Sequence, residues 1–103
     1  MYRHRVRREV VYGHFREFME IAEALNDLTK QRGWTGSTFW TPTVGLGNEV
    51  IVETEYSDLA SFERENEAFY ADAEVMDTLR RLSEHVVQGS MRDELLEEAP
   101  HIA

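Results

Sequence analysis

The chain has 103 residues, which is enough for one domain, and its 42% hydrophobic and 30% charged residues are typical of a globular protein. Eleven basic residues stand against twenty acidic ones, so the net charge of −9 disfavours nucleic acid or a membrane as a partner. There is no cysteine for disulfides or thiolate catalysis, and the charged N-terminus lacks the apolar segment of a signal peptide. We therefore expect a cytoplasmic protein.

Residues 2–10 predict a strand with an unusual distribution of charge. Because strand side chains alternate, Arg3, Arg5 and Arg7 share one face with Glu9. The other face carries a mixed set of residues, namely Tyr2, His4, Val6, Arg8 and Val10. The glycine of Tyr12-Gly13 then permits a turn.

Residues 14–32 predict a helix, because apolar residues recur there every three or four positions and Gly33 is a natural stop. Residues 35–42 and 48–56 are rich in β-branched and aromatic side chains, which favours strands. The connection between them, at 43–47, contains two glycines and predicts a hairpin.

Residues 58–71 and 73–84 predict a second helical stretch in two segments, since Asp72 can cap a new helix after a kink. Residues 85–91 (HVVQGSM) predict a short final strand. We place the domain at residues 1–92 and expect residues 93–103 to form an acidic, loosely held C-terminal tail.

The predicted order β-α-β-β-α-β is that of the ferredoxin-like α+β fold, a four-stranded antiparallel sheet with both helices on one face. The first and third strands are central neighbours in that topology. The other face should be polar if it is bare, yet Phe39-Trp40 sends one aromatic ring to each face, and Ile51 lies opposite Val50. We therefore predict a homodimer in which two sheets pack face to face.

Four segments carry a resemblance to a known family: Gly13–Phe18 (GHFREF), Gly45–Val50 (GLGNEV), Glu55–Leu59 (EYSDL) and Tyr70–Glu74 (YADAE). In this order the chain resembles the dimeric α+β barrel superfamily and, within it, the NIPSNAP-like branch. The resemblance spans nearly the whole chain and implies the same fold and dimer. It implies no single activity, because the superfamily includes cofactor-free antibiotic biosynthesis monooxygenases acting on polyketide-like quinols, haem-degrading enzymes, isomerases and proteins of unknown function.

Two of these activities can be compared with the residues present. Haem-degrading relatives carry an asparagine on the first strand and a histidine on the second helix, whereas this chain has arginines on that strand and no histidine in its second helical stretch before His85. The resemblance therefore disfavours haem oxygenation. The quinol monooxygenases favour an asparagine and tryptophan pair, and no pair in this sequence can be assigned to it.

The arginine row faces a matching row of acids in the neighbouring predicted strand, formed by Glu49, Glu53 and Glu55. One interpretation is a cross-strand ladder of ion pairs, which is the commoner arrangement. The other is an anion site in which an arginine fork holds a carboxylate or phenolate. Aromatic residues could in addition line a flat, apolar cavity. Our candidates for a ligand pocket are Arg3, Arg5, Arg7, Trp40, Glu53 and Tyr56.

The four histidines, His4, His14, His85 and His101, lack the spacing of a metal site, so we expect no metal. The sequence also has no phosphate loop and no flavin signature, so we expect no other cofactor. Two functional hypotheses remain. The first is a small homodimeric barrel that binds an aromatic or polyketide-like metabolite and acts as a cofactor-independent monooxygenase, isomerase or cyclase. The second is a non-catalytic accessory or stress-related protein in which these residues serve the fold and the dimer. The sequence leaves open whether the protein is an enzyme.

Overall fold

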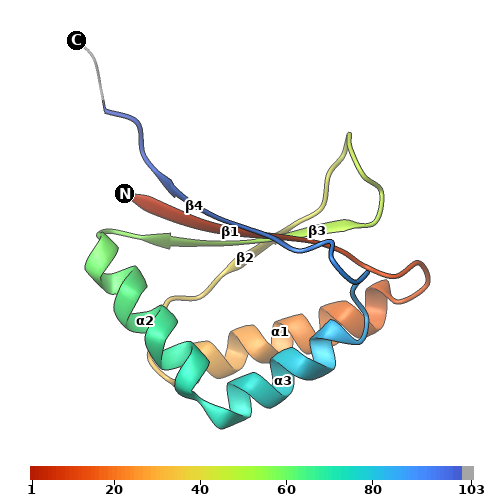
Figure 1. The fold of residues 1–103 in the computed structure, drawn as a ribbon, viewed down its shortest axis with the longest axis horizontal. Helices are drawn as coiled ribbons and strands as arrows, with labels where there is room; N and C mark the ends of the chain where they lie inside the picture. The colour runs from red at the N-terminus through yellow and green to blue at the C-terminus, as the bar shows by residue number, and fades with distance from the viewer. Residues whose placement is uncertain (101–103) are drawn as a thin grey trace.

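A four-stranded antiparallel sheet carries three helices on one face in the computed structural model, which describes residues 1–100 (Figure 1). The elements in chain order are β1 (Tyr2–Glu9), α1 (Phe15–Gln31), β2 (Thr38–Trp40), β3 (Glu49–Tyr56), α2 (Leu59–Ala71), α3 (Ala73–Ser83) and β4 (Arg92–Glu97). The strand order β2-β3-β1-β4 confirms the predicted ferredoxin-like fold, with β1 and β3 at the centre. We call the helix-free side of the sheet the open face.

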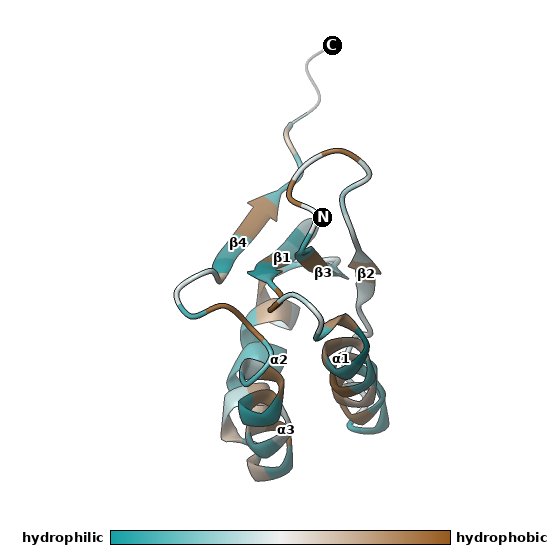
Figure 2. Cartoon of the chain, turned by 90° about the vertical axis from the view of Figure 1, so that its right-hand side faces the viewer, coloured by the Kyte–Doolittle hydropathy of each residue, from teal (hydrophilic) through white to brown (hydrophobic). Residues whose placement is uncertain are grey.

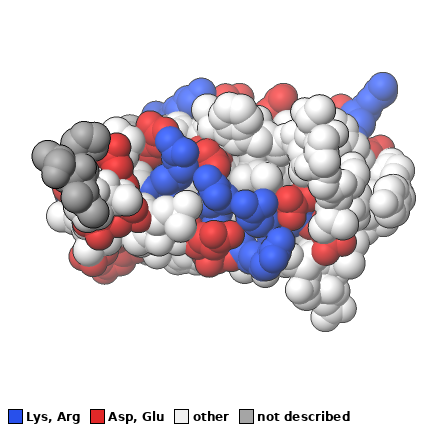
Figure 3. Space-filling model, turned by 90° about the horizontal axis from the view of Figure 1, so that it is seen from above, with Lys and Arg blue, Asp and Glu red and all other residues white. Residues whose placement is uncertain are grey.

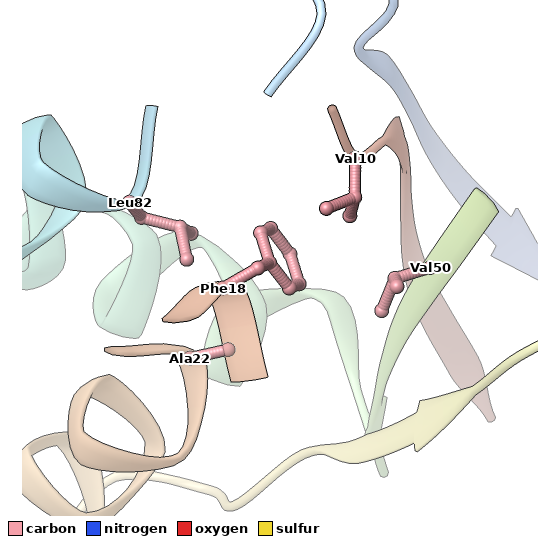
Figure 4. Packing of buried hydrophobic residues seen from close by; sticks show 5 residues of the cluster. All are labelled: Val10, Phe18, Ala22, Val50 and Leu82. Atoms are coloured by element: carbon pink, nitrogen blue, oxygen red, sulfur yellow. The ribbon is translucent and has the colours of Figure 1, made fainter. Parts of the chain in front are cut away.

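The hydrophobic core lies at one end of the layer between helices and sheet. Phe18 and Ala22 of α1 pack there against Val10, Val50 and Leu82 (Figure 4). Phe18 is fully buried, because α1 is amphipathic and turns its apolar stripe toward the sheet. Figure 2 shows this two-layer arrangement, with apolar residues on α1, α3 and β4. The small core closes one end of the layer and leaves the other end less filled.

The predicted break in the second helical stretch is confirmed at Asp72. Its side chain accepts hydrogen bonds from the backbone N–H groups of Glu74 and Val75, at 3.0 and 3.1 Å, and so caps α3. Its other carboxylate oxygen accepts a hydrogen bond from Arg32 Nε at 2.8 Å, which ties the kink to the end of α1. No helix within residues 1–100 is long and apolar enough to cross a membrane.

The prediction for the last strand is wrong. Residues 85–91 form only an isolated bridge, between Val86 and Val10, followed by a turn at Gly89. The strand β4 comes later, from sequence that we expected in the acidic tail, and it pairs with β1 along Tyr2–Arg7. The acidic composition of this segment predicts a loosely held tail, whereas the basic strand β1 offers its carboxylates partners, Arg7 for Glu94 and His4 for Asp93. The expected strand at 35–42 is likewise shorter, at Thr38–Trp40.

The core predicts a sharp contrast between two phenylalanines of α1. Phe18→Ala should lower the free energy of unfolding by about 3–5 kcal/mol, because it removes a fully buried ring and leaves a cavity. Phe15 is 53% exposed, so Phe15→Ala should change it by less than about 0.5 kcal/mol. Urea denaturation of both variants measures the difference, and equal effects would contradict this description of the core.

Candidate functional site

The arginines of β1 form a ladder of ion pairs with β3 across the open face. Arg5 Nε lies 2.6 Å from a carboxylate oxygen of Glu53, and Arg3 Nη2 lies 2.6 Å from one of Glu55. Their positions follow from the register, in which Arg5 is opposite Glu53 and Arg3 is opposite Glu55. These two rungs are the cross-strand contacts expected from the sequence.

The third rung joins three strands around Arg7. Arg7 Nη1 contacts Glu49 of β3 at 3.2 Å, and Arg7 Nε contacts Glu94 of β4 at 3.1 Å. Glu49 is buried and also lies 3.7 Å from Arg92. In Figure 3 the basic side chains form a diagonal band across the open face, with acidic side chains on both sides of it. Since Arg3, Arg5 and Arg7 all have acidic partners, the ladder accounts for the whole arginine row.

A pocket of about 140 Å³ lies on the other side of the sheet, beneath the helices. Its floor is built from side chains of β1 and β3 that alternate with the ladder residues, and its walls come from all three helices. Aromatic rings line much of it: Trp34, Phe39, Tyr56, Phe69 and Tyr70. Polar groups among them include His4, Arg8, Asn66 and Asp93. A concave, largely apolar site with a few polar groups is typical of small-molecule binding.

Arg8 is the half-buried basic residue of this pocket. It lies opposite core residue Val50 in the register, so its side chain is on the helix side of the sheet. Within residues 1–100 its guanidinium has no carboxylate at ion-pair distance and donates no hydrogen bond. Burial lowers the pKa of Arg8, although Tyr70 and Asp93 partly counteract this effect. An arginine remains charged even when it is partly buried, so the pocket contains a cation that has no ion-pair partner within residues 1–100.

His4 and Asp93 form a hydrogen-bonded pair in the same pocket. His4 Nε2 lies 2.5 Å from Asp93 Oδ1, and the imidazole packs edge-on against Phe62. With an ionised carboxylate as the acceptor, Nε2 is the donor of this hydrogen bond, and Nδ1 is the ring nitrogen that Asp93 leaves unused. The pair thus fixes the orientation of the imidazole.

Tyr56 contributes a buried phenol to the pocket. Burial raises the pKa of Tyr56 to about 12, and the negative charge of Glu65 adds to this effect. Glu65 is itself held by Thr35, whose backbone N–H and hydroxyl donate to it at 2.6 and 3.0 Å. Tyr56 therefore stays a neutral phenol near neutral pH, when it can donate a hydrogen bond.

The structure separates the candidate residues predicted from the sequence into two groups. Arg3, Arg5, Arg7, Glu53 and Trp40 lie on the open face. Tyr56 is on the helix side, because it is five positions from Ile51, the register partner of Trp40. The two groups therefore do not form one pocket.

Sequence reasoning placed His4 and Arg8 on the helix side of the first strand but did not select them as site residues. The sequence signal that could have identified them is one charged and one titratable residue on the face of the strand that the helices must cover. His14 and His85 meet elsewhere, with their Nδ1 atoms 3.0 Å apart. His101 lies outside the described residues.

Both the sequence and the fold of this chain are similar to those of known proteins. The family model described as NIPSNAP matches residues 9–101 of the chain. No curated protein matches it. An uncharacterised NIPSNAP domain protein from Burkholderia xenovorans superposes with a TM-score of 0.79 at 18% sequence identity, covering 100% of this chain and 99% of that one.

Two further solved structures have the same fold. A NIPSNAP family protein from Agrobacterium tumefaciens gives a TM-score of 0.75 at 15% identity, with coverage of 95% of this chain and 85% of that chain. A structure described as an antibiotic biosynthesis monooxygenase gives 0.74 at 11% identity, with coverage of 97% and 100%. Likenesses at these identities establish the fold alone.

The ladder predicts a measurable coupling between Arg5 and Glu53. Glu53→Gln should lower the free energy of unfolding by about 2 kcal/mol, because it leaves the half-buried Arg5 without its charged partner. A double-mutant cycle with Arg5→Gln should give a coupling of about 1 kcal/mol. Glu63→Gln, at an exposed position on α2, is the control. An effect of Glu53→Gln no larger than the control would contradict the ladder.

The pKa of Tyr56 predicts a loss of stability at high pH. The unfolded chain ionises this phenol near its usual value of about 10, whereas the folded chain holds the proton to about 12. Stability from this group is complete below pH ~10 and is lost as the pH rises toward ~12, by up to ~3 kcal/mol.

Ultraviolet titration of tyrosinate tests this assignment directly. Tyr56→Phe should remove an ionisation step near pH 12, and Tyr12→Phe, which alters an 80% exposed ring, should leave that step in place. If Tyr56→Phe removes only an earlier step, the description of this phenol as shielded in the folded protein is wrong.

Proposed function

The chain belongs to the NIPSNAP family, and on this premise we propose that it acts as a homodimer that binds a small aromatic molecule in the pocket beneath the helices. The observation that carries this proposal is the presence of five aromatic side chains in the lining of one pocket, where polar side chains stand among them. Rings of this kind provide large apolar contact areas for a planar ligand.

The volume of the pocket limits the ligand. About 140 Å³ is close to the ~150 Å³ of an apolar cavity that takes up benzene. A single aromatic ring therefore fits inside. Tyr70 and Met91 line the pocket and are 56% and 53% exposed, so they mark its opening to solvent. A larger, polyketide-like molecule would place one ring in the pocket and extend past these two residues.

The His4–Asp93 pair favours a reaction that begins with proton removal. A histidine fixed by a carboxylate, with its second ring nitrogen free to accept a proton, is the arrangement used in general-base catalysis. Such a step suits a cofactor-independent monooxygenase, isomerase or cyclase, because each can start by deprotonating its substrate. His4 is the group that we assign to this role.

The open face supports the homodimer. Trp40 and Leu96 project from it and are 55% and 38% exposed, and Ile51 lies opposite Trp40 in the register. The loop between β2 and β3 rises on this side in Figure 1, and its Val44 is 93% exposed. A second copy of the sheet would cover these apolar side chains, which are unusual on a solvent-facing sheet.

The alternative is a non-catalytic accessory protein in which the same dimer forms and the pocket is never occupied. The two proposals differ in whether the pocket binds an aromatic ring at all. They make the same prediction about the dimer, so binding and assembly need separate experiments.

Binding is tested with benzamide, a neutral single-ring probe. Chemical-shift changes in a protein NMR titration should concentrate on residues lining the pocket, Trp34 among them. Asn66→Phe should weaken binding by about tenfold or more, because it fills the pocket from α2. Glu67→Phe, at the exposed neighbouring position, should leave binding unchanged. Equal affinities for both variants, or no binding by the wild type, would support the non-catalytic alternative.

Assembly is tested by light scattering on the purified protein. The wild type should have twice the 12.0 kDa mass of one chain, and Trp40→Glu should reduce the mass to that of a monomer by placing charges within the apolar contact. Phe15→Glu alters an equally exposed aromatic residue on the helical side and should leave the mass unchanged. A wild-type monomer at micromolar concentration would contradict the homodimer.

A further inference from the structure

We propose that the ligand of this pocket carries an acidic oxygen, a carboxylate or phenolate on its aromatic ring, and that Arg8 is its counter-ion. The inference rests on the proposed function, and it assigns the chemical class of the ligand and the residue that recognises it. Its starting point is a difference between arginines of one strand. Arg3, Arg5 and Arg7 are paired on the open face, whereas Arg8 lines the pocket on the opposite side.

Arg8 differs from every other basic residue among residues 1–100. The other half-buried basic residues all contact glutamates, at 2.6–3.2 Å; they are Arg3, Arg5 and Arg7 on the open face. The basic residues without an acidic partner, such as Arg16 and Arg81, are exposed and hydrated by solvent. Arg8 alone combines partial burial with the absence of a partner. Burying a charge is unfavourable unless it is paired, so an incoming anion would compensate a cost that the free protein already bears.

The acidic residues of the pocket do not neutralise Arg8. Two carboxylates line the pocket, those of Glu65 and Asp93. Asp93 Oδ1 is hydrogen-bonded to His4 Nε2 at 2.5 Å. Glu65 accepts two hydrogen bonds from Thr35, at 2.6 and 3.0 Å. Both are thus occupied by other donors. Asp93 lies near enough to act on the charge of Arg8 but not at ion-pair distance from it.

The surroundings of Arg8 indicate a carboxylate or phenolate on a ring. A guanidinium presents a planar fork of donors that matches such an oxygen or pair of oxygens. The pocket supplies one cation whose guanidinium is not paired with either lining carboxylate, and its aromatic walls leave room for about one aromatic ring. The net charge of −9 repels anions from the molecule as a whole. A preference for an anionic ligand must therefore come from this local contact.

The test compares benzoate with benzamide, which has nearly the same shape and no charge, by NMR titration of the wild type and two variants. Wild-type protein should bind benzoate about 10- to 100-fold more tightly than benzamide, as a charge-assisted contact provides. Arg8→Gln should abolish this preference and leave the affinity for benzamide unchanged. Arg16→Gln removes the same charge from the exposed side of α1 and should behave as the wild type.

The outcomes separate this inference from the proposed function. If benzamide binds and benzoate binds no more tightly, or if Arg8→Gln retains the preference, the role of Arg8 is wrong and the aromatic pocket stands. If neither probe binds the wild type, both proposals fail. Circular dichroism checks that Arg8→Gln is folded. If Arg8→Gln does not fold, Arg8→Lys is measured in its place, because lysine keeps the charge but lacks the planar fork of donors. A preference for benzoate that Arg8→Lys retains in full would overturn bidentate recognition by Arg8.

Discussion

The two-residue alternation of β1 places its charges on both sides of the sheet, and much of the structure depends on that division. On the open face, Arg3, Arg5 and Arg7 meet glutamates from β3 and β4 at 2.6–3.2 Å. The central strand is thus linked electrostatically to both of its neighbours. On the helix side, His4 and Arg8 line a pocket together with five aromatic rings.

The position of the core explains why a pocket can exist in so small a domain. Phe18, Val50 and Val75 are the largest side chains that are fully buried. A short chain has little apolar material with which to fill the space between its two layers. The core therefore closes the end of the layer near Val10, and a space lined by aromatic rings remains toward Tyr56. The less filled end is thus where the proposed ligand would bind.

Much of the fold could be predicted because local signals agreed with one another. The alternation in residues 2–10, the break at Asp72 and the hairpin all led to the correct sheet order. The last strand could not, because half of the residues of β4 are acidic and the segment becomes a strand beside a basic neighbour. Its contacts with Arg7 and His4 are tertiary, and no local propensity of the segment indicates them.

The candidate site shows a similar limit. The pairing of Arg3 and Arg5 with Glu55 and Glu53 followed from alternation and strand order. The isolation of Arg8 did not, because an absent partner is visible only when every neighbouring element is in place. Trp40 and Tyr56 were predicted together on the basis of residue type, but strand register separates them onto opposite faces. Residue type suggested aromatic binding, and register decided which rings can take part.

The strand β1 thus has three arginines committed to the fold and one available to an anion. Nitrogen-15 NMR of the arginine side chains tests this division, because each Nε–H group reports its own contacts. On addition of benzoate, the Arg8 signal should shift while those of Arg3, Arg5 and Arg7 stay in place. Shifts of the ladder arginines with an unchanged Arg8 signal would contradict it.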